Sequence, residues 1–180
     1  MISITLGRLP CLRRPFDDRA VLRMNAPSSA FAGEIRPAQE ADCARIAELA
    51  GQLSYPSTPE EVTQRMTEMK GDADHLVFVA ELATGEIAGW IAVFVYRTVE
   101  ADARAEVSGL VVDERFRSQR IGEGLLARSE EWARERGCDV IGLRSNVVRE
   151  RAHAFYERHG YRHSKTQKSF RKTLDRPHFN

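Results

Sequence analysis

Residues 111–126, VVDERFRSQRIGEGLL, carry the clearest chemical signal, because a predicted buried strand leads through a polar turn into a helix. Gly122 and Gly124 fall in the first helical turn, where each glycine costs about 1 kcal/mol relative to alanine. A close approach to the backbone explains such a cost. The N–H groups and positive dipole at a helix start favour phosphate, and Arg117 and Arg120 add charged donors. We therefore predict a diphosphate-binding loop, against the alternative of an ordinary strand-to-helix turn.

This loop and a second segment, residues 149–161 (RERAHAFYERHGY), resemble the two sequence blocks of the GNAT family of N-acetyltransferases. The loop is similar to the phrase Arg/Gln-x-x-Gly-x-Gly/Ala, with Arg117 and Gly122 at its ends, Arg120 in place of its first glycine, and Gly124 in the extended pattern. The second block is similar to Asn-x-x-Ala-x-x-Phe-Tyr-x-x-x-Gly-Phe/Tyr, with Arg149 in place of asparagine. Its matching positions are Ala152, Phe155, Tyr156, Gly160 and Tyr161.

The resemblance covers about residues 34–174 and implies an α/β fold of the GNAT type. Such a fold has a mixed, mostly antiparallel central sheet that is splayed at the CoA site and flanked by about four helices. The implied reaction moves acetyl from acetyl-CoA, the co-substrate, to a primary amine of a small molecule or peptide, with both substrates bound. The residues implied in acetyl-CoA binding are Leu110, Val111, Val112, Arg117, Ser118, Gln119, Arg120, Ile121, Gly122, Glu123, Gly124, Arg149 and Phe155.

Two catalytic roles follow from the same resemblance. Tyr156 matches the family tyrosine that protonates the departing CoA thiolate, and its alternative role is that of a core aromatic residue. An alkylamine with a pKa of about 10.4 is protonated at neutral pH, so a base or a water chain must remove a proton. Glu106 lies in the strand region where several family members carry this base, against the alternative of a solvated surface carboxylate; Ser108 is a second polar candidate. A catalytically silent CoA-binding sensor or interaction module is the competing function.

The resemblance also implies an acceptor pocket built from residues 52–69 and 164–170, and a possible homodimer through a C-terminal strand. Tyr55, Glu60, Glu61 and Glu68 are candidates for attracting a cationic amine. Which amine is accepted stays open at this stage.

Composition excludes several other classes of protein. The chain has 180 residues, with 27 basic and 26 acidic side chains, so no overall charge favours nucleic acid or a membrane surface. Its three cysteines are scattered, which indicates a reducing compartment, and we expect a cytoplasmic protein. No apolar run approaches the roughly 20 residues that span a bilayer. His153 and His159 are six residues apart and lack the spacing of a zinc helix, so we expect no metal.

Periodicity of the apolar residues predicts the order of the elements. Strands are expected at residues 34–36, 75–82, 87–96, 105–112 and 139–145, and a last strand within residues 161–174. Helices are expected at residues 40–53, 59–69, 121–136 and 149–159, and Gly109 marks a bulge inside its strand. We expect residues 1–33 to form a poorly ordered N-terminal arm and residues 34–176 to form the acetyltransferase domain.

Overall fold

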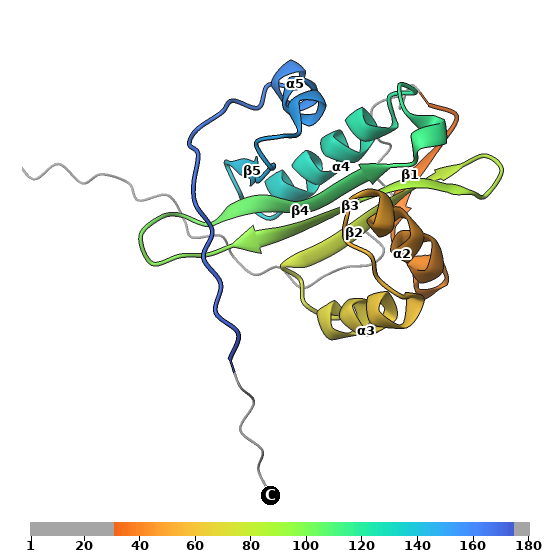
Figure 1. The fold of residues 1–180 in the computed structure, drawn as a ribbon, viewed down its shortest axis with the longest axis horizontal. Coiled ribbons are helices and arrows are strands. Elements are labelled where there is room, and N and C mark those ends of the chain that lie inside the picture. Colours follow the sequence, from red (N-terminus) through yellow and green to blue (C-terminus); the bar gives the residue numbers. More distant parts are fainter. Residues whose placement is uncertain (1–30, 175–180) are drawn as a thin grey trace, which may run out of the picture. The chain divides into compact units, whose positions relative to one another are not determined.

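The computed structural model describes residues 31–174 (Figure 1), so most of the N-terminal arm predicted for residues 1–33 lies outside the described residues. Two compact units make up the described chain, and they meet in the sequence between Arg144 and Ser145. The elements of the first unit, in chain order, are β1 (Gly33–Pro37), η1 (Glu40–Asp42), α2 (Cys43–Gln52), α3 (Pro59–Met69), β2 (His75–Leu82), β3 (Ile87–Tyr96), β4 (Arg104–Val112), η2 (Glu114–Phe116), α4 (Ile121–Glu135) and β5 (Ile141–Leu143). The second unit holds α5 (Glu150–Arg158).

A five-stranded sheet with the order β1-β2-β3-β4-β5 organises the first unit. The first four strands are antiparallel neighbours, and β5 joins β4 in parallel. Pairing between β4 and β5 covers only Ala105↔Ile141, Glu106↔Gly142 and Val107↔Leu143. The second half of β4 therefore continues without a β5 partner among the described residues.

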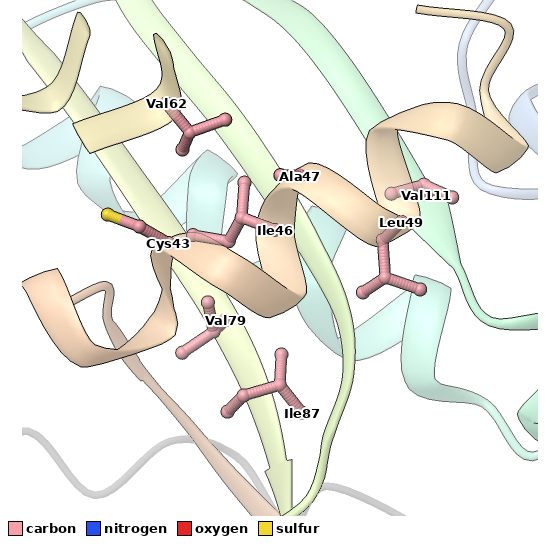
Figure 2. Close-up of a cluster of buried hydrophobic side chains, with 8 residues drawn as sticks. All are labelled: Cys43, Ile46, Ala47, Leu49, Val62, Val79, Ile87 and Val111. Atoms are coloured by element: carbon pink, nitrogen blue, oxygen red, sulfur yellow. The ribbon is translucent and has the colours of Figure 1, made fainter. Parts of the chain in front are cut away.

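Helices cover both faces of this sheet (Figure 1). On one face, α2 and α3 pack against the strands through a buried cluster, shown in Figure 2. On the other face, the long helix α4 buries Leu125 and Trp132, which are 0% and 1% exposed, and its Arg128 guanidinium lies 4.8 Å from the ring centroid of Phe78. The cluster on the α2 and α3 face consists of Cys43, Ile46, Ala47, Leu49, Val62, Val79, Ile87 and Val111.

Local signals in the sequence explain where these helices begin and end. Thr58 caps α3, because its hydroxyl accepts a hydrogen bond from the backbone N–H of Glu61 while the Glu61 carboxylate accepts one from the N–H of Thr58. Gly137 and Gly160, which follow α4 and α5, have φ angles of 72° and 85°. Such left-handed backbone is typical of glycine after the end of a helix.

The last predicted strand is wrong. Residues 161–174 contain no strand, and most of them are exposed. Strand formation in water needs apolar side chains that one face can bury, and this segment offers little beyond Tyr161, Phe170 and Leu174 among many charged and polar residues. The fifth strand is also shorter than predicted, with three residues in place of seven. None of the described helices is long and apolar enough to cross a membrane.

Candidate active site

The loop between β4 and α4 contains two residues in the left-handed backbone region. Ser118 has a φ of 65° and Arg120 a φ of 61°. Arg120 occupies the position at which the GNAT phrase has its first glycine, and it is the N-cap of α4. Left-handed backbone is unfavourable for residues with a Cβ. The GNAT phrase has glycine at this position because the loop needs a left-handed φ angle there. Here an arginine adopts the same path.

The N-terminus of α4 is not capped by a side chain. Arg120 makes no capping hydrogen bond, whereas Thr58 caps α3. The first intrahelical bond of α4 runs from the N–H of Gly124 to the carbonyl of Arg120, over 3.0 Å. The backbone N–H groups of the preceding helical residues thus lie at the positive end of a helix of 15 residues. Their arrangement suits an anionic group.

Each arginine of the loop already contacts a carboxylate of the same segment. The Arg120 guanidinium donates two hydrogen bonds to Glu123, from Nε to Oε2 over 2.8 Å and from Nη2 to Oε1 over 2.6 Å, and this contact raises the arginine pKa. Arg117 Nη2 lies 3.4 Å from Glu114 Oε1. Each of these carboxylates offsets the positive charge of its arginine, so the net positive charge of the loop is smaller than its arginines alone indicate.

Gly124 has a packing role that the sequence did not reveal. A Cβ atom at this position would lie 2.8 Å from Ile35 Cδ1 and 3.5 Å from Phe31 Cε1, closer than ordinary contact for the first of these atoms. The glycine therefore allows α4 to lie close to β1. Ile121 beside the loop is 1% exposed and anchors the helix start in the core.

Asp113, at the beginning of the loop, is fixed by arginines from two directions. Its carboxylate accepts hydrogen bonds from Arg115, over 2.9 Å from the backbone N–H, and also from Arg45 of α2. Arg45 in turn donates from Nε to the Ile87 carbonyl over 3.1 Å. The contact with Arg115, followed by that with Arg45, holds the pKa of Asp113 far below its ordinary value despite burial. This group of charges ties the loop to α2.

The predicted bulge in β4 is confirmed. Pairing with β3 shifts register between Ala92 and Val93, whose β4 partners are Gly109 and Val107, so Ser108 is the extra residue. A Cβ on Gly109 would lie 2.8 Å from the ring of Trp90, so glycine leaves room for this indole. Bulges of this kind re-aim the side chains around them.

Glu106 lies two positions before the bulge and is 7% exposed, so it is not a solvated surface carboxylate. Its Oε1 lies 2.7 Å from Nη2 of Arg144, which directly follows β5, and its Oε2 lies 4.0 Å from Nη2 of Arg104. Arg104 also stacks over the Tyr96 ring at 4.5 Å. The Arg144 contact depends on the parallel register of β5, so no local pattern in the sequence indicates it.

A cavity of about 260 Å³ opens beside the bulge, between α2, α3 and the sheet. Of the four side chains proposed from the sequence to attract an amine, only Tyr55 belongs to its described lining. Trp90 packs on Gly109 and also forms one wall. The described lining consists of Ile46, Ala50, Leu53, Tyr55, Ser57, Val62, Arg65, Met66, Met69, Val77, Trp90, Ala92, Ser108 and Gly109.

The second unit contains the predicted residues Arg149, Phe155 and Tyr156. Arg149 is the N-cap of α5 and makes no side-chain capping bond. Phe155 lies edge-to-face with Tyr156, with ring centroids 5.4 Å apart, and 4.5 Å from the ring of His159. Burial raises the pKa of the Tyr156 phenol above its ordinary value, although the positive charge of Arg149 opposes the shift.

Comparison with known proteins assigns the family. The sequence model of the Acetyltransferase (GNAT) family matches residues 42–161. The chain belongs to the GNAT family. This GNAT protein is 39% identical over 84 residues to the aminoalkylphosphonate N-acetyltransferase of Salmonella typhimurium, an alignment that covers 46% of this chain and 54% of that enzyme. The chain thus spans about half the length of this relative.

Two further relatives match over a larger part of the GNAT chain. The aminoglycoside N(6')-acetyltransferase type 1 of Stenotrophomonas maltophilia is 29% identical over 151 residues, which are 81% of this chain and 97% of that protein. The crystal structure of glucosamine-6-phosphate N-acetyltransferase from Arabidopsis thaliana has a TM-score of 0.66 and 27% identity, and covers 79% of this chain and 99% of that one. The mixed, mostly antiparallel sheet is therefore a GNAT fold.

Proposed function

We propose that the chain transfers the acetyl group of acetyl-CoA to a primary amine while both substrates are bound. One observation carries this proposal: Arg120, the N-cap of α4, makes no side-chain capping bond and adopts left-handed backbone at the position of the family glycine. The same segment begins on the half of β4 that lacks a β5 partner. Family membership and the names of the three relatives, all N-acetyltransferases, support the same reaction class.

The loop and the unpaired half of β4 fit the two parts of CoA. The diphosphate would accept hydrogen bonds from the N–H groups at residues 121–123, at the positive end of α4. The amide-bearing pantetheine arm would lie along the backbone of residues 110–112. We assign Arg117, Ser118, Gln119 and Arg120 to the loop around the diphosphate, and we assign Arg149 and Phe155 to the same co-substrate.

The chemistry needs one group that accepts a proton and one that donates a proton. Acetyl-CoA supplies an activated thioester. We assign Glu106 as the base that takes a proton from the acceptor ammonium, directly or through water, so that the nitrogen lone pair can attack the carbonyl carbon. A new C–N bond forms as the C–S bond breaks. A backbone N–H, from Val111, would stabilise the oxyanion that develops between these events.

Tyr156 is assigned as the acid that protonates the departing thiolate. Its raised pKa keeps the phenol protonated throughout the neutral range, so the proton is present when the C–S bond breaks. Two protons leave the nitrogen: one passes from the ammonium to Glu106 before attack, and the second passes through water to the Tyr156 phenolate as the amide forms. Tyr156 has meanwhile given its proton to sulfur, and Glu106 returns its proton to solvent, so the products are the amide, the free thiol and one H⁺.

The test is isothermal titration of the purified chain with acetyl-CoA, beside the Gly122→Trp and Tyr156→Phe variants. We expect wild-type binding that Gly122→Trp abolishes, because a large side chain would enter the diphosphate loop, and that Tyr156→Phe preserves. Gly51→Trp is a matched control, since a Cβ at this exposed glycine meets no atom within 4 Å. Absence of binding to a folded wild-type chain would overturn the proposal.

Turnover separates the enzyme from the competing function. Release of free thiol in the presence of an amine panel is expected for an acetyltransferase, with a strong loss of kcat in Tyr156→Phe. Binding of acetyl-CoA without thiol release from any amine would instead identify a catalytically silent CoA-binding module.

A further inference from the structure

The cavity beside the β4 bulge has an apolar wall. Its sides are formed by the ring of Trp90, the aromatic ring of Tyr55 and the side chains of Leu53, Met66 and Met69. The floor reaches the buried cluster of Figure 2, because Ile46 and Val62 belong to both. An occupant would therefore gain by removing apolar surface from water.

The β-sheet register places this cavity next to Glu106. Ala92 and Phe94 are two residues apart on β3 and face the same side of the sheet. Their partners on β4 are Gly109 and Glu106. Same-side neighbours on a strand are about 7 Å apart, so the Cα of Glu106, beside Phe94, lies roughly this distance along the sheet from Ala92 of the cavity wall.

The polar groups of the cavity are few, and the buried indole N–H of Trp90 has no hydrogen-bond partner among the described residues. Arg65 is the one charged residue in the described lining, and it already donates to Ser57 Oγ over 2.9 Å and lies 3.6 Å from Glu61 Oε2. The described lining includes no carboxylate that would hold a polycationic sugar. It also includes no second cation that would neutralise a phosphate dianion.

We propose that the acceptor is a primary amine carrying one compact apolar group, of the size of a single aromatic ring, which lies in this cavity while the amine faces Glu106. The inference rests on the proposed acetyltransferase function and specifies its substrate class. A volume of about 260 Å³ is below the roughly 300–1,000 Å³ of pockets that hold drug-sized ligands. An arylalkylamine fits better than an aminoglycoside or a sugar phosphate.

The first test compares initial rates of thiol release from acetyl-CoA with matched amines. 2-Phenylethylamine and ethylamine differ by the aromatic ring, and glucosamine 6-phosphate and 2-aminoethylphosphonate supply polar alternatives. We expect kcat/KM for 2-phenylethylamine to exceed each of the other three by roughly 10- to 100-fold, the discrimination that apolar burial gives in such pockets. Equal values for 2-phenylethylamine and ethylamine, or a preference for a polar amine, would overturn the substrate class and leave the acetyltransferase function standing.

Two variants that change the cavity size in opposite directions connect the preference to this cavity. Ala92→Leu fills the space beside the bulge and should lower the ratio of the 2-phenylethylamine rate to the ethylamine rate at least 10-fold. Met69→Ala enlarges the cavity and should improve a naphthyl amine relative to 2-phenylethylamine. Ala101→Leu, in the exposed loop between β3 and β4, makes the same chemical change elsewhere and should leave both ratios unaltered. A loss of preference in all three variants would contradict the assignment.

If no amine is acetylated, the proposed function fails. Direct binding of the amine then still tests the inference about the cavity. Titration calorimetry with 2-phenylethylamine alone should show binding to the wild type that Ala92→Leu weakens and Ala101→Leu retains. No binding to the wild type, or equal binding to all three chains, would overturn the inference regardless of turnover.

Discussion

Replacing Arg120 by glycine should stabilise the chain relative to replacing it by alanine. Both changes remove the guanidinium and its contact with Glu123, so the comparison isolates the backbone. The residue has a φ of 61°, which a glycine adopts freely and an alanine does not. The same pair of changes at Arg134 provides a control with the opposite sign, because that residue lies in regular helix near the end of α4.

The magnitude follows from two opposing terms. Left-handed backbone costs a residue with a Cβ about 1–2 kcal/mol, whereas the freedom of glycine in the unfolded chain costs about 0.4–1 kcal/mol. The difference favours glycine by about 0.5–1 kcal/mol at this position. A domain of this size changes its Tm by about 2–4 °C per kcal/mol, so Arg120→Gly should melt about 1–4 °C above Arg120→Ala. At Arg134, helix propensity should reverse the order by a similar amount.

Thermal unfolding followed by circular dichroism would measure all four variants under one condition, and urea midpoints would check that the order does not depend on the method. If Arg120→Ala melted at or above Arg120→Gly while the Arg134 pair behaved as expected, the left-handed conformation of this residue in solution would be refuted. The explanation of the family glycine as a backbone requirement would fail with it.

Three other changes test the rest of the site. Glu123→Gln frees the Arg120 guanidinium for the diphosphate, so acetyl-CoA should bind several-fold more tightly by calorimetry, with a steeper dependence on salt; unchanged affinity and salt dependence would contradict this reading. Asp113→Asn should lower the Tm by about 5–10 °C at pH 7, because it removes the buried carboxylate that pairs with the part-buried Arg45 and with Arg115. Since the folded-state pKa of Asp113 lies below its unfolded value of about 3.9, the stabilising carboxylate is present above that pH, and the difference from wild type should shrink as the melting buffer is acidified below it. Gly109→Ala pushes a Cβ into the Trp90 ring and should cost about 1–3 kcal/mol in a urea titration; a neutral result would mean that the indole lies elsewhere.

Local patterns in the sequence predicted most of the fold. The β2 and β3 strands begin and end where alternation and a turn at Gly85 indicate, and α4 follows the spacing of its buried residues. The last strand could not be decided in this way. Alternation in residues 161–174 favours a strand, but formation depends on a partner and on apolar burial that the sequence of one segment does not specify.

The candidate site was predictable only where chemistry is local. The phosphate-binding character of the loop is predictable because it follows from a continuous run of residues. The left-handed backbone of Arg120 is not predictable from the residue type, because arginine rarely adopts that conformation. The burial of Glu106 and its contact with Arg144 depend on the register of a parallel strand, and no pattern within either strand reports it. Trp90 forms a cavity wall because Gly109, on the neighbouring antiparallel strand β4, leaves room for its indole, and the sequence of β3 alone does not show this neighbour.

Helix α2 belongs to both halves of the proposed site. Its Ile46 and Ala50 line the amine cavity, and its Arg45 holds Asp113 at the start of the diphosphate loop. An occupant that shifts this helix would therefore move an anchor of the loop as well. By linkage, the two substrates should then alter each other's affinity by the same factor. A larger acceptor amine would therefore change the affinity for acetyl-CoA, although the amine contacts no residue that binds acetyl-CoA.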